Sequence, residues 1–220
     1  MPNPPAPGPS LYRWPIRVLA ILLVAAFVYR FSAPAPPPHS VNEASELRKY
    51  SIVPPFVLTE RSGKTITNKD LAGKIWVADF VYTTCPGPCP LITASMVKVQ
   101  DAVAHDPQVQ LVSFTVDPLT DTPAVLSAYA DKFGADPYRW WFLTGPEKPL
   151  DNLIENGFLQ VVEDNRGQPP QEGQFTVTHS TKLALVDAEG YVRGFFDGVG
   201  ADGRADLLKA IKTLETEENH

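Results

Sequence analysis

Apolar and polar residues alternate along most of the chain in blocks that predict strands and helices in turn. Residues 74–82 form a nearly continuous apolar run rich in aromatic and β-branched side chains, which is typical of a central strand covered on both faces, and residues 109–117 and 139–145 predict two further strands. The segments 90–104 and 122–134 between them are amphipathic and have the length of helices. Strands that alternate with helices predict an α/β fold with a mostly parallel sheet.

Further elements flank these central blocks. Residues 55–74 predict a short hairpin with a Ser-Gly turn, and residues 149–158 predict another helix. Residues 181–196 predict an antiparallel hairpin that turns at Glu189–Gly190. A closing helix over 203–217 should present one apolar face, made of Leu207, Leu208, Ile211 and Leu214.

Near the N-terminus the apolar residues are concentrated instead of alternating, because Val18–Tyr29 is an unbroken apolar run. Its twelve residues are short for a bilayer span of about 20, as is typical of the apolar core of a cleaved signal peptide. However, Pro36 follows the small residues Ala33–Ala35 and makes a poor cleavage site, and the flanking arginines can snorkel and lengthen the span. We therefore favour an uncleaved transmembrane anchor over residues 13–31.

Charge and proline content predict how the rest of the chain is arranged around this anchor. Arg13 and Arg17 precede the apolar run without any acidic residue, so the arm 1–12 should stay inside and the remainder should cross the inner membrane to the periplasmic side. Residues 32–50 are rich in proline and poor in core residues, which predicts a tether to a globular domain over 51–220.

The globular part carries a strong negative charge. Three of the 19 basic residues and none of the 25 acidic ones precede residue 32, which leaves 16 basic against 25 acidic residues and a net charge of −9. A negative domain argues against nucleic acid as a partner and for a protein partner.

The only two cysteines, Cys85 and Cys89, lie in the stretch TTCPGPCP directly after the first central strand. Open α/β sheets place functional sites in loops at this end of their strands. A dithiol of this spacing can close a structural disulfide, exchange disulfides with a partner or hold one soft metal ion. In an oxidising compartment, a single closely spaced pair of cysteines indicates one functional site, whereas proteins stabilised by structural disulfides usually carry several pairs. Spacing alone leaves the metal and redox alternatives open.

Several short stretches together resemble the Sco/SenC family and occur in that family's order: YTTCPGPCP from residue 82, TVDPLTDTP from 115, FLTG from 142, THST from 178 and LVDAEG from 185. Members of this family are membrane-anchored copper-binding proteins that serve the assembly of cytochrome c oxidase. The resemblance covers nearly the whole chain. It implies a thioredoxin-like α/β fold with an N-terminal hairpin, preceded by a single membrane-anchoring helix.

By this resemblance, the family's metal site carries over to Cys85, Cys89 and His179. Two thiolates and one imidazole suit copper, because thiolates favour Cu(I) while a nitrogen ligand keeps Cu(II) acceptable. We therefore expect one copper ion per chain and no other cofactor. His179 stands where thioredoxin-like oxidoreductases carry a cis-proline, which favours a ligand role at this position. Many relatives have an acidic and an apolar residue between the cysteines, where this chain has Gly87 and Pro88.

Three aspartates are candidates for supporting roles around this site. Asp79 lies six residues before Cys85 in an otherwise apolar strand, where thioredoxins keep a buried acid that assists proton transfer. Burial would raise its pKa and let it influence the thiols, whereas a side chain that reaches solvent would do neither. Asp117 and Asp121 follow the next strand and either orient the metal site or form turn and cap structures near Thr122.

These observations predict a membrane-tethered copper metallochaperone that delivers copper to the copper-A site of cytochrome c oxidase. Its expected partners are the oxidase subunit that carries this site, a protein that loads the copper, and the membrane. The alternative is an extracytoplasmic thiol-disulfide oxidoreductase, in which Cys85 and Cys89 form a redox-active pair that reduces the copper-A cysteines or another partner. Enzymatic activity is expected only under this alternative. A peroxidase and a membrane-spanning copper or redox sensor are weaker hypotheses.

Overall fold

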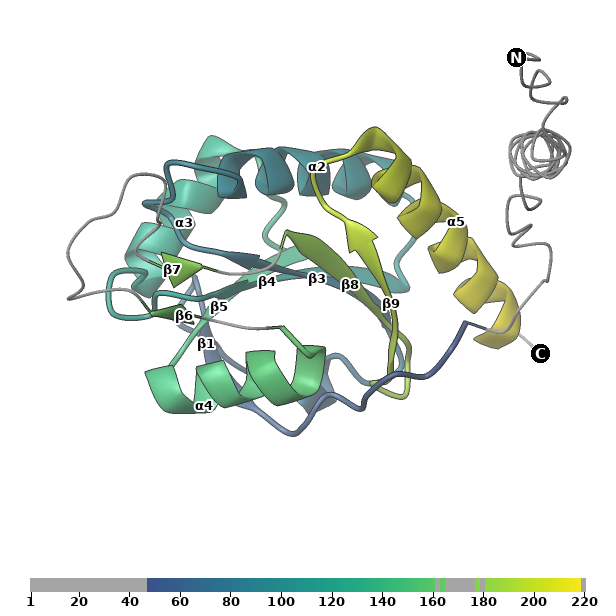
Figure 1. Ribbon diagram of the computed structural model, residues 1–220, viewed down its shortest axis with the longest axis horizontal. Coiled ribbons are helices and arrows are strands. Elements are labelled where there is room, and N and C mark those ends of the chain that lie inside the picture. The colour runs from purple at the N-terminus through teal and green to yellow at the C-terminus, as the bar shows by residue number, and fades with distance from the viewer. Residues whose placement is uncertain (1–46, 161–162, 165–176, 179–180, 219–220) are drawn as a thin grey trace, which may run out of the picture. The chain divides into compact units, whose positions relative to one another are not determined.

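The structure is a computed structural model that describes residues 47–160, 163–164, 177–178 and 181–218. The predicted arm, anchor and most of the predicted tether lie outside these residues. Within the described part of the chain, no helix has the length and apolar character needed to cross a bilayer. A seven-stranded sheet in the order β2-β1-β5-β4-β3-β8-β9 forms the centre of the fold and has helices on both faces (Figure 1).

The three strands at the centre of this sheet are parallel, as the apolar runs predict. They are β3 (Ile75–Val81), β4 (Val109–Thr115) and β5 (Trp140–Thr144). Every residue of β3 and β4 is buried, because helices cover both faces of the sheet there. The carboxyl ends of these strands therefore meet at one edge, where the cysteine loop begins.

The outer strands are antiparallel and make the sheet mixed. The hairpin of β1 (Val57–Glu60) and β2 (Thr65–Thr67) pairs with β5, and the hairpin of β8 (Lys182–Val186) and β9 (Val192–Asp197) pairs with β3. Both hairpins were predicted, but the prediction of a mostly parallel sheet is wrong. A hairpin joins an existing edge without a crossover helix, so each one adds antiparallel pairs to a parallel centre.

The helices form two layers, one on each face of the sheet. Figure 1 shows α2 (Cys89–Ala102), α3 (Pro123–Lys132) and α5 (Ala201–Glu218) together on one face. The other face carries α4 (Glu147–Asn152), which continues into a π-helical turn at Leu153–Gly157. A 3-10 turn at Asn68–Asp70 follows β2, and the short strands β6 (Glu163–Asp164) and β7 (Val177–Thr178) pair as a separate ribbon.

Two apolar clusters fill the space between the layers, and the alternation of side chains along β3 assigns residues to them. Ile75 and Val77 face α2, α3 and α5, whereas Trp76 and Phe80 face the layer of α4. The predicted apolar face of α5 packs on the cluster that contains Ile75 and Val77. Its residues Leu207, Ile211 and Leu214 are buried there, and Leu208 is partly buried. Both cysteines belong to the cluster on the Trp76 face.

Candidate functional site

The cysteines lie on a short loop that joins the end of β3 to the start of α2, as predicted from the order strand, loop, helix. The N–H of Cys85 donates to the carbonyl of Tyr82 at 3.2 Å, which closes a tight turn directly after the strand. The carbonyl of Pro88 accepts hydrogen bonds from the next turn of the helix, so α2 begins at Cys89. One cysteine is thus held by a turn and the other by a helix N-terminus.

The two cysteines are buried and not joined in a disulfide, and their sulfurs are near enough to interact with each other. Cys85 is 8% exposed and Cys89 is 0% exposed. The thiol of Cys89 hydrogen-bonds to the sulfur of Cys85, and the N–H of Gly87 donates to the same sulfur at 3.4 Å. Pro86 and Pro88 have no N–H group, so Gly87 is the one residue between the cysteines that can donate from its backbone. The loop therefore presents two adjacent sulfurs in a restricted conformation.

The pKa values of the two thiols are shifted in opposite directions. Burial by itself raises the pKa of Cys85, but the interactions with the thiol and the N–H of Cys89 and with the N–H of Gly87 outweigh it, so the pKa lies below its ordinary value. Burial, and then the hydrogen bond to Cys85, raise the pKa of Cys89. The pair therefore favours a thiolate at Cys85 while Cys89 keeps its proton.

Tyr82 is a site residue to which the sequence assigned no role. It continues the alternation of Trp76 and Phe80 one step past the end of β3, so its ring is buried on the same face as the cysteines. Burial, and then the proximity of Cys85, raise the pKa of the Tyr82 hydroxyl. The sequence did contain a signal for this position. Tyr82 is an even number of residues from Trp76 and Phe80, which places it on the same face of the strand, and it lies three residues before Cys85.

Asp121 contacts the start of the cysteine loop from a neighbouring loop, and its predicted role in orienting the metal site stays a prediction. Its fully buried carboxylate accepts from the hydroxyl of Thr83 at 2.6 Å and from the hydroxyl of Thr115 at 2.6 Å. The N–H of Thr83 also donates to both oxygens, at 3.3 and 3.2 Å. Burial raises the pKa of Asp121, although these hydrogen bonds counteract the shift. Asp121 thereby fixes the residue that lies two positions before Cys85.

Asp117 shapes the turn in which Asp121 lies. Its carbonyl accepts from the N–H groups of Thr120 at 3.1 Å and Asp121 at 2.9 Å, and its own N–H donates to the hydroxyl of Thr115 at 3.0 Å. The cap of α3 is Thr122, whose hydroxyl accepts from the N–H of its third following residue at 3.4 Å. Thr122 is thus the residue that caps α3, and Asp117 forms the turn that precedes it.

Asp79 is completely buried, which excludes the alternative that it reaches solvent. It faces the α2, α3 and α5 layer, where its Oδ1 accepts from the hydroxyl of Ser113 at 2.5 Å, and Trp140 donates to the same hydroxyl at 2.8 Å. Oδ2 has no hydrogen-bond partner among the described residues. Burial raises the pKa of Asp79 to about 7, against the opposing hydrogen bond from Ser113. Its negative charge in turn helps to raise the pKa of Cys89.

His179, the predicted third ligand, lies outside the described residues. Within the described ranges no three histidine, cysteine, aspartate or glutamate side chains gather as metal ligands. The two sulfurs are therefore the part of the predicted metal site whose geometry is defined, and the role of His179 stays a prediction.

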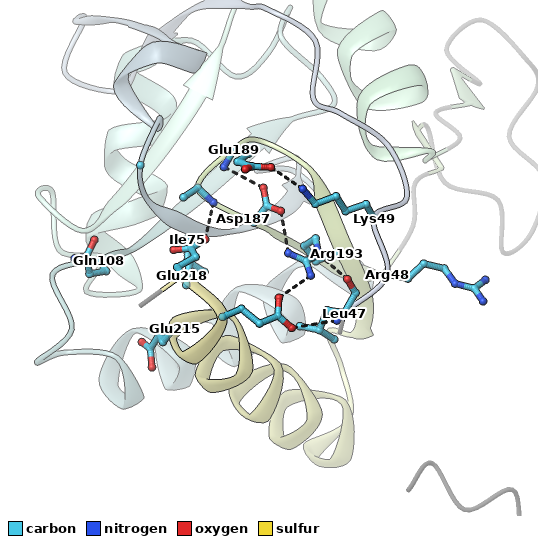
Figure 2. A pocket seen from close by; sticks show the side chains of 13 residues that line it. Leu47, Arg48, Lys49, Ile75, Gln108, Asp187, Glu189, Arg193, Glu215 and Glu218 are labelled. Carbon is cyan, nitrogen blue, oxygen red and sulfur yellow. Dashed lines mark hydrogen bonds and ion pairs between the residues drawn. The ribbon is translucent and has the colours of Figure 1, made fainter. Parts of the chain in front are cut away.

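A separate cavity of about 1000 Å³ lies at the opposite end of the sheet, where β3 starts and β8 ends. Figure 2 shows Arg193 at its centre, with ion pairs to Asp187 at 3.0 Å and Glu217 at 2.8 Å. The guanidinium also donates to the carbonyl of Leu47 at 2.7 Å. This network ties the beginning of the described chain to β9 and α5, far along the strands from the cysteine loop.

Comparison with known proteins matches this arrangement to one family. The family model described as SCO1/SenC matches residues 44–215. A SCO1/SenC family lipoprotein from Bacillus anthracis has a similar crystal structure, with a TM-score of 0.69, 33% sequence identity, and coverage of 78% of this chain and 99% of that chain.

Two further solved structures extend the likeness. BsSco, described as a member of the Sco family of cytochrome c oxidase assembly proteins with a disulfide switch, gives a TM-score of 0.67 at 29% identity over 78% of this chain and 97% of its own. The structure of Bradyrhizobium japonicum ScoI with copper bound gives a TM-score of 0.60 at 28% identity, over 72% of this chain and 99% of its own. The residues 44–215 that the family model matches include the seven-stranded sheet and the loop with both cysteines.

Proposed function

The chain belongs to the SCO1/SenC family, and on that premise we propose that it is a membrane-tethered copper metallochaperone for the copper-A centre of cytochrome c oxidase. The observation that carries this proposal is the adjacent pair of sulfurs of Cys85 and Cys89, not joined in a disulfide, on a loop restrained by prolines. Soft thiolates of this kind favour Cu(I). The lowered pKa of Cys85 makes it easier for this thiol to lose its proton when copper binds.

His179 completes the proposed ligand set for one copper ion per chain. The support for it is the resemblance of THST, from residue 178, to the family's motif, and the chemistry of an imidazole beside two thiolates. A nitrogen ligand keeps Cu(II) acceptable in the same site, so the protein can carry copper in either oxidation state. A similar protein, ScoI of Bradyrhizobium japonicum, has been solved with copper bound.

Copper transfer proceeds by exchange of ligands, so the ion never enters solvent. A thiolate of the receiving protein binds the copper, and one sulfur of the donor leaves; repetition of this step moves the ion across. Cys85 is the more exposed of the two sulfurs, while Cys89 is fully enclosed. The receiving protein therefore approaches from the side of Cys85, and Cys89 releases the copper last.

The second candidate function is reduction of disulfides, and the opposite pKa shifts of the two thiols favour it. The thiolate of Cys85 attacks one sulfur of a partner disulfide, and the partner's other sulfur leaves as a thiolate. Cys89 then loses its proton and attacks Cys85, which releases the partner's second thiolate. The chain ends as a disulfide and the partner as a dithiol, so the copper-A cysteines would be prepared to accept copper. BsSco, a similar protein, is described as containing a disulfide switch.

The proposed location is the outer face of the inner membrane, with residues 13–31 as anchor and the copper domain on the periplasmic side. The arginines and the apolar run of the N-terminus support this orientation. A similar solved structure is that of a lipoprotein. The proposed partners are the oxidase subunit with the copper-A site and a protein that supplies the copper.

The test is an anaerobic copper titration of the reduced full chain in detergent, followed by mixing with a copper-A domain in its reduced or its disulfide form. A metallochaperone binds one copper and transfers it to the reduced domain. An oxidoreductase acts on the disulfide form and becomes oxidised itself, with or without copper. A chain that binds no copper while it still reduces the disulfide would contradict the first proposal and support the second.

A further inference from the structure

Exposed apolar side chains surround the cysteine loop. Leu91, in the first turns of α2, is 59% exposed, and Leu119, in the loop after β4, is 68% exposed. We call the whole set the apolar rim, and its members are Pro86, Pro90, Leu91, Leu119 and Val125. Single exposed apolar side chains are ordinary on a protein surface, so the rim has a meaning only if its members lie together.

The turn that carries Leu119 is fixed beside the cysteine loop. Leu119 lies between Asp117 and Asp121, and the carbonyl of Asp117 accepts from the N–H of Asp121 at 2.9 Å, which closes the turn. The carboxylate of Asp121 accepts from the hydroxyl of Thr83 at 2.6 Å. Thr83 lies two residues before Cys85. Leu119 is therefore exposed next to the start of the cysteine loop.

The first turns of α2 and α3 lie at the same place. The hydroxyls of Thr93 and Tyr129 share a hydrogen bond at 2.8 Å, which joins the two helices. Both helices begin at the edge of the sheet where the parallel strands end. One turn nearer to that edge, α2 has Cys89 and α3 has Val125, so Val125 lies beside the start of α2. Leu91 extends the rim along the exposed side of α2.

The segments that form the rim expose no charged side chain. Residues 82–97 contain no aspartate, glutamate, lysine or arginine, and the one such residue over 118–130 is Asp121, which is completely buried. By contrast, residues 32–220 as a whole contain 25 acidic and 16 basic residues. Charged side chains are depleted at the centres of protein interfaces, where apolar contact excludes water. The rim therefore fits an apolar protein surface and does not fit a charged small ligand.

The position of the rim around the two sulfurs indicates what covers it. Cys85 is only 8% exposed and Cys89 is fully enclosed, so an incoming thiolate reaches these sulfurs only when its protein lies against the neighbouring residues. Those neighbouring residues are the rim. A folded protein that exchanges metal ligands at this loop thus covers the rim each time it does so.

We propose that the apolar rim is the docking surface for the protein that receives the copper, and that this partner is a folded domain whose metal-binding thiolates lie within an apolar, uncharged surface of their own. This inference rests on the proposed metallochaperone function and adds the residues by which the partner is recognised. Apolar contact around the sulfurs holds the complex together while ligands exchange, and it keeps water away from the ion. The hydrogen bonds described above fix the rim before the partner arrives, so docking costs little conformational entropy.

The experiment compares copper transfer from the wild type with transfer from Leu91→Lys and Leu119→Lys. Ile52→Lys is the matched control, because Ile52 is 55% exposed and forms a bridge with Tyr191 at the other end of the sheet. Each full chain, in detergent and loaded with Cu(I), is mixed with a reduced copper-A domain, and the second-order rate constant of transfer is measured. Each rim variant should transfer copper about tenfold more slowly than the wild type, because it loses the burial of one leucine and places a charge in an apolar contact. The control should transfer at the wild-type rate.

Two further measurements separate docking from metal binding. The first is the Cu(I) affinity of each variant by chelator competition, which should equal that of the wild type because the rim supplies no proposed ligand. Equal affinity also shows that the exposed substitutions leave the domain folded. The second is the rate of copper transfer to dithiothreitol, a small uncharged dithiol that needs no docking surface. This rate should be the same in the wild type and in all three variants.

The outcomes separate this inference from the proposed function. If both rim variants load the copper-A domain at the wild-type rate, the inference is wrong and the metallochaperone proposal stands. Equal slowing of transfer to dithiothreitol and to the protein would also overturn the inference, since the effect would then lie at the metal site. If the wild type transfers no copper but reduces the disulfide form of the domain, the proposed function fails. The same variants then decide whether the rim docks that protein, by tenfold slower reduction or by reduction at the wild-type rate. A wild type that neither transfers copper nor reduces the disulfide would contradict both.

Discussion

The hydroxyl of Thr83 donates to the carboxylate of Asp121 at 2.6 Å, although the two residues are 38 positions apart in the sequence. This bond joins the loop after β4 to the beginning of the cysteine loop. It explains how a short loop with two thiols keeps one arrangement without a disulfide. The bond also provides a way to loosen the candidate site without touching either sulfur.

Asp121→Ala should weaken copper binding through this loss of support. The change leaves the N–H and hydroxyl of Thr83 without their acceptor, and loss of a supporting partner of this kind typically costs about 10- to 100-fold in metal affinity. Competition with a Cu(I) chelator measures the effect. Thr122→Ala is the control, because it removes the cap of α3, at about 1 kcal/mol of stability, and leaves Thr83 in place. Equal copper affinity of the folded Asp121→Ala protein and the wild type would rule out this supporting role.

The opposite pKa shifts of the thiols predict selective alkylation. Iodoacetamide at neutral pH should modify Cys85 before Cys89, since the pKa of Cys85 is lowered and the pKa of Cys89 is raised. Peptide mass measurement over time gives the order. The rate at Cys85 should rise with pH through a midpoint below the ordinary pKa of a cysteine. In Cys89→Ala the hydrogen bond from Cys89 is lost, and this midpoint should move up. First modification of Cys89 would contradict the assignment of the thiolate.

Asp79 should make the protein less stable as the pH rises. Its pKa is about 7 in the folded protein against 3.8 as the ordinary value, so between these values the folded state binds one proton more than the unfolded state. The free energy of unfolding should then fall by about 1.4 kcal/mol per pH unit from pH 4 to 7 on account of this group. Asp79→Asn keeps an oxygen for Ser113 and removes the titration, so the variant should gain stability over the wild type at pH 8.

Denaturant unfolding at pH 5 and pH 8 measures this difference. Asp70→Asn provides a control with the opposite sign, because a hydrogen bond from Thr67 lowers the pKa of Asp70, so its contribution is present above its ordinary pKa and is lost as the pH falls. If Asp79→Asn is less stable than the wild type at both pH values by the same amount, the charge of Asp79 carries no penalty and the prediction is wrong.

The network around Arg193 should matter for stability and not for copper. Arg193→Met leaves Asp187 and Glu217 without their buried cation and releases the carbonyl of Leu47, which should cost about 3 kcal/mol of unfolding free energy. Copper affinity of the folded variant should equal that of the wild type, since the network and the cysteines lie at opposite ends of the sheet. Lys49→Gln removes an exposed pair with Glu189 and should change stability little. Loss of copper affinity in Arg193→Met would show coupling between the two ends.

His179→Ala tests the third proposed ligand. Cu(II) prefers nitrogen more strongly than Cu(I) does, so the variant should lose most of its Cu(II) affinity and much less of its Cu(I) affinity. The thiols should still oxidise and reduce reversibly, because that reaction needs only Cys85 and Cys89. Anaerobic Cu(I) titration and Cu(II) absorption spectra measure the two affinities. Wild-type Cu(II) binding combined with failed oxidase assembly would make His179 a partner-contact residue instead.

The elements of the fold followed from local patterns in the sequence. The apolar run at 74–82 predicts β3, and the helix N-terminus at Pro90 and the hairpin turn at Glu189–Gly190 were placed within a few residues of their positions. These features depend on the period of apolar side chains and on turn residues, which act over short stretches of chain. For the same reason, the local sequence pattern was enough to predict that Cys85 and Cys89 follow the carboxyl end of a central strand.

Pairing between distant parts of the chain was decided only by the tertiary structure. The sequence does not show that two hairpins join a parallel centre, or that Thr83 meets Asp121, since hydrogen-bond partners across the sheet depend on how the layers assemble. The thiolate at Cys85 likewise depends on Cys89 and on the N–H of Gly87, which reach its sulfur once the turn has closed. The sequence by itself determined which elements form and which sulfurs are available. Tertiary structure decided their charge and support, because burial and directed hydrogen bonds exist only after the layers have packed.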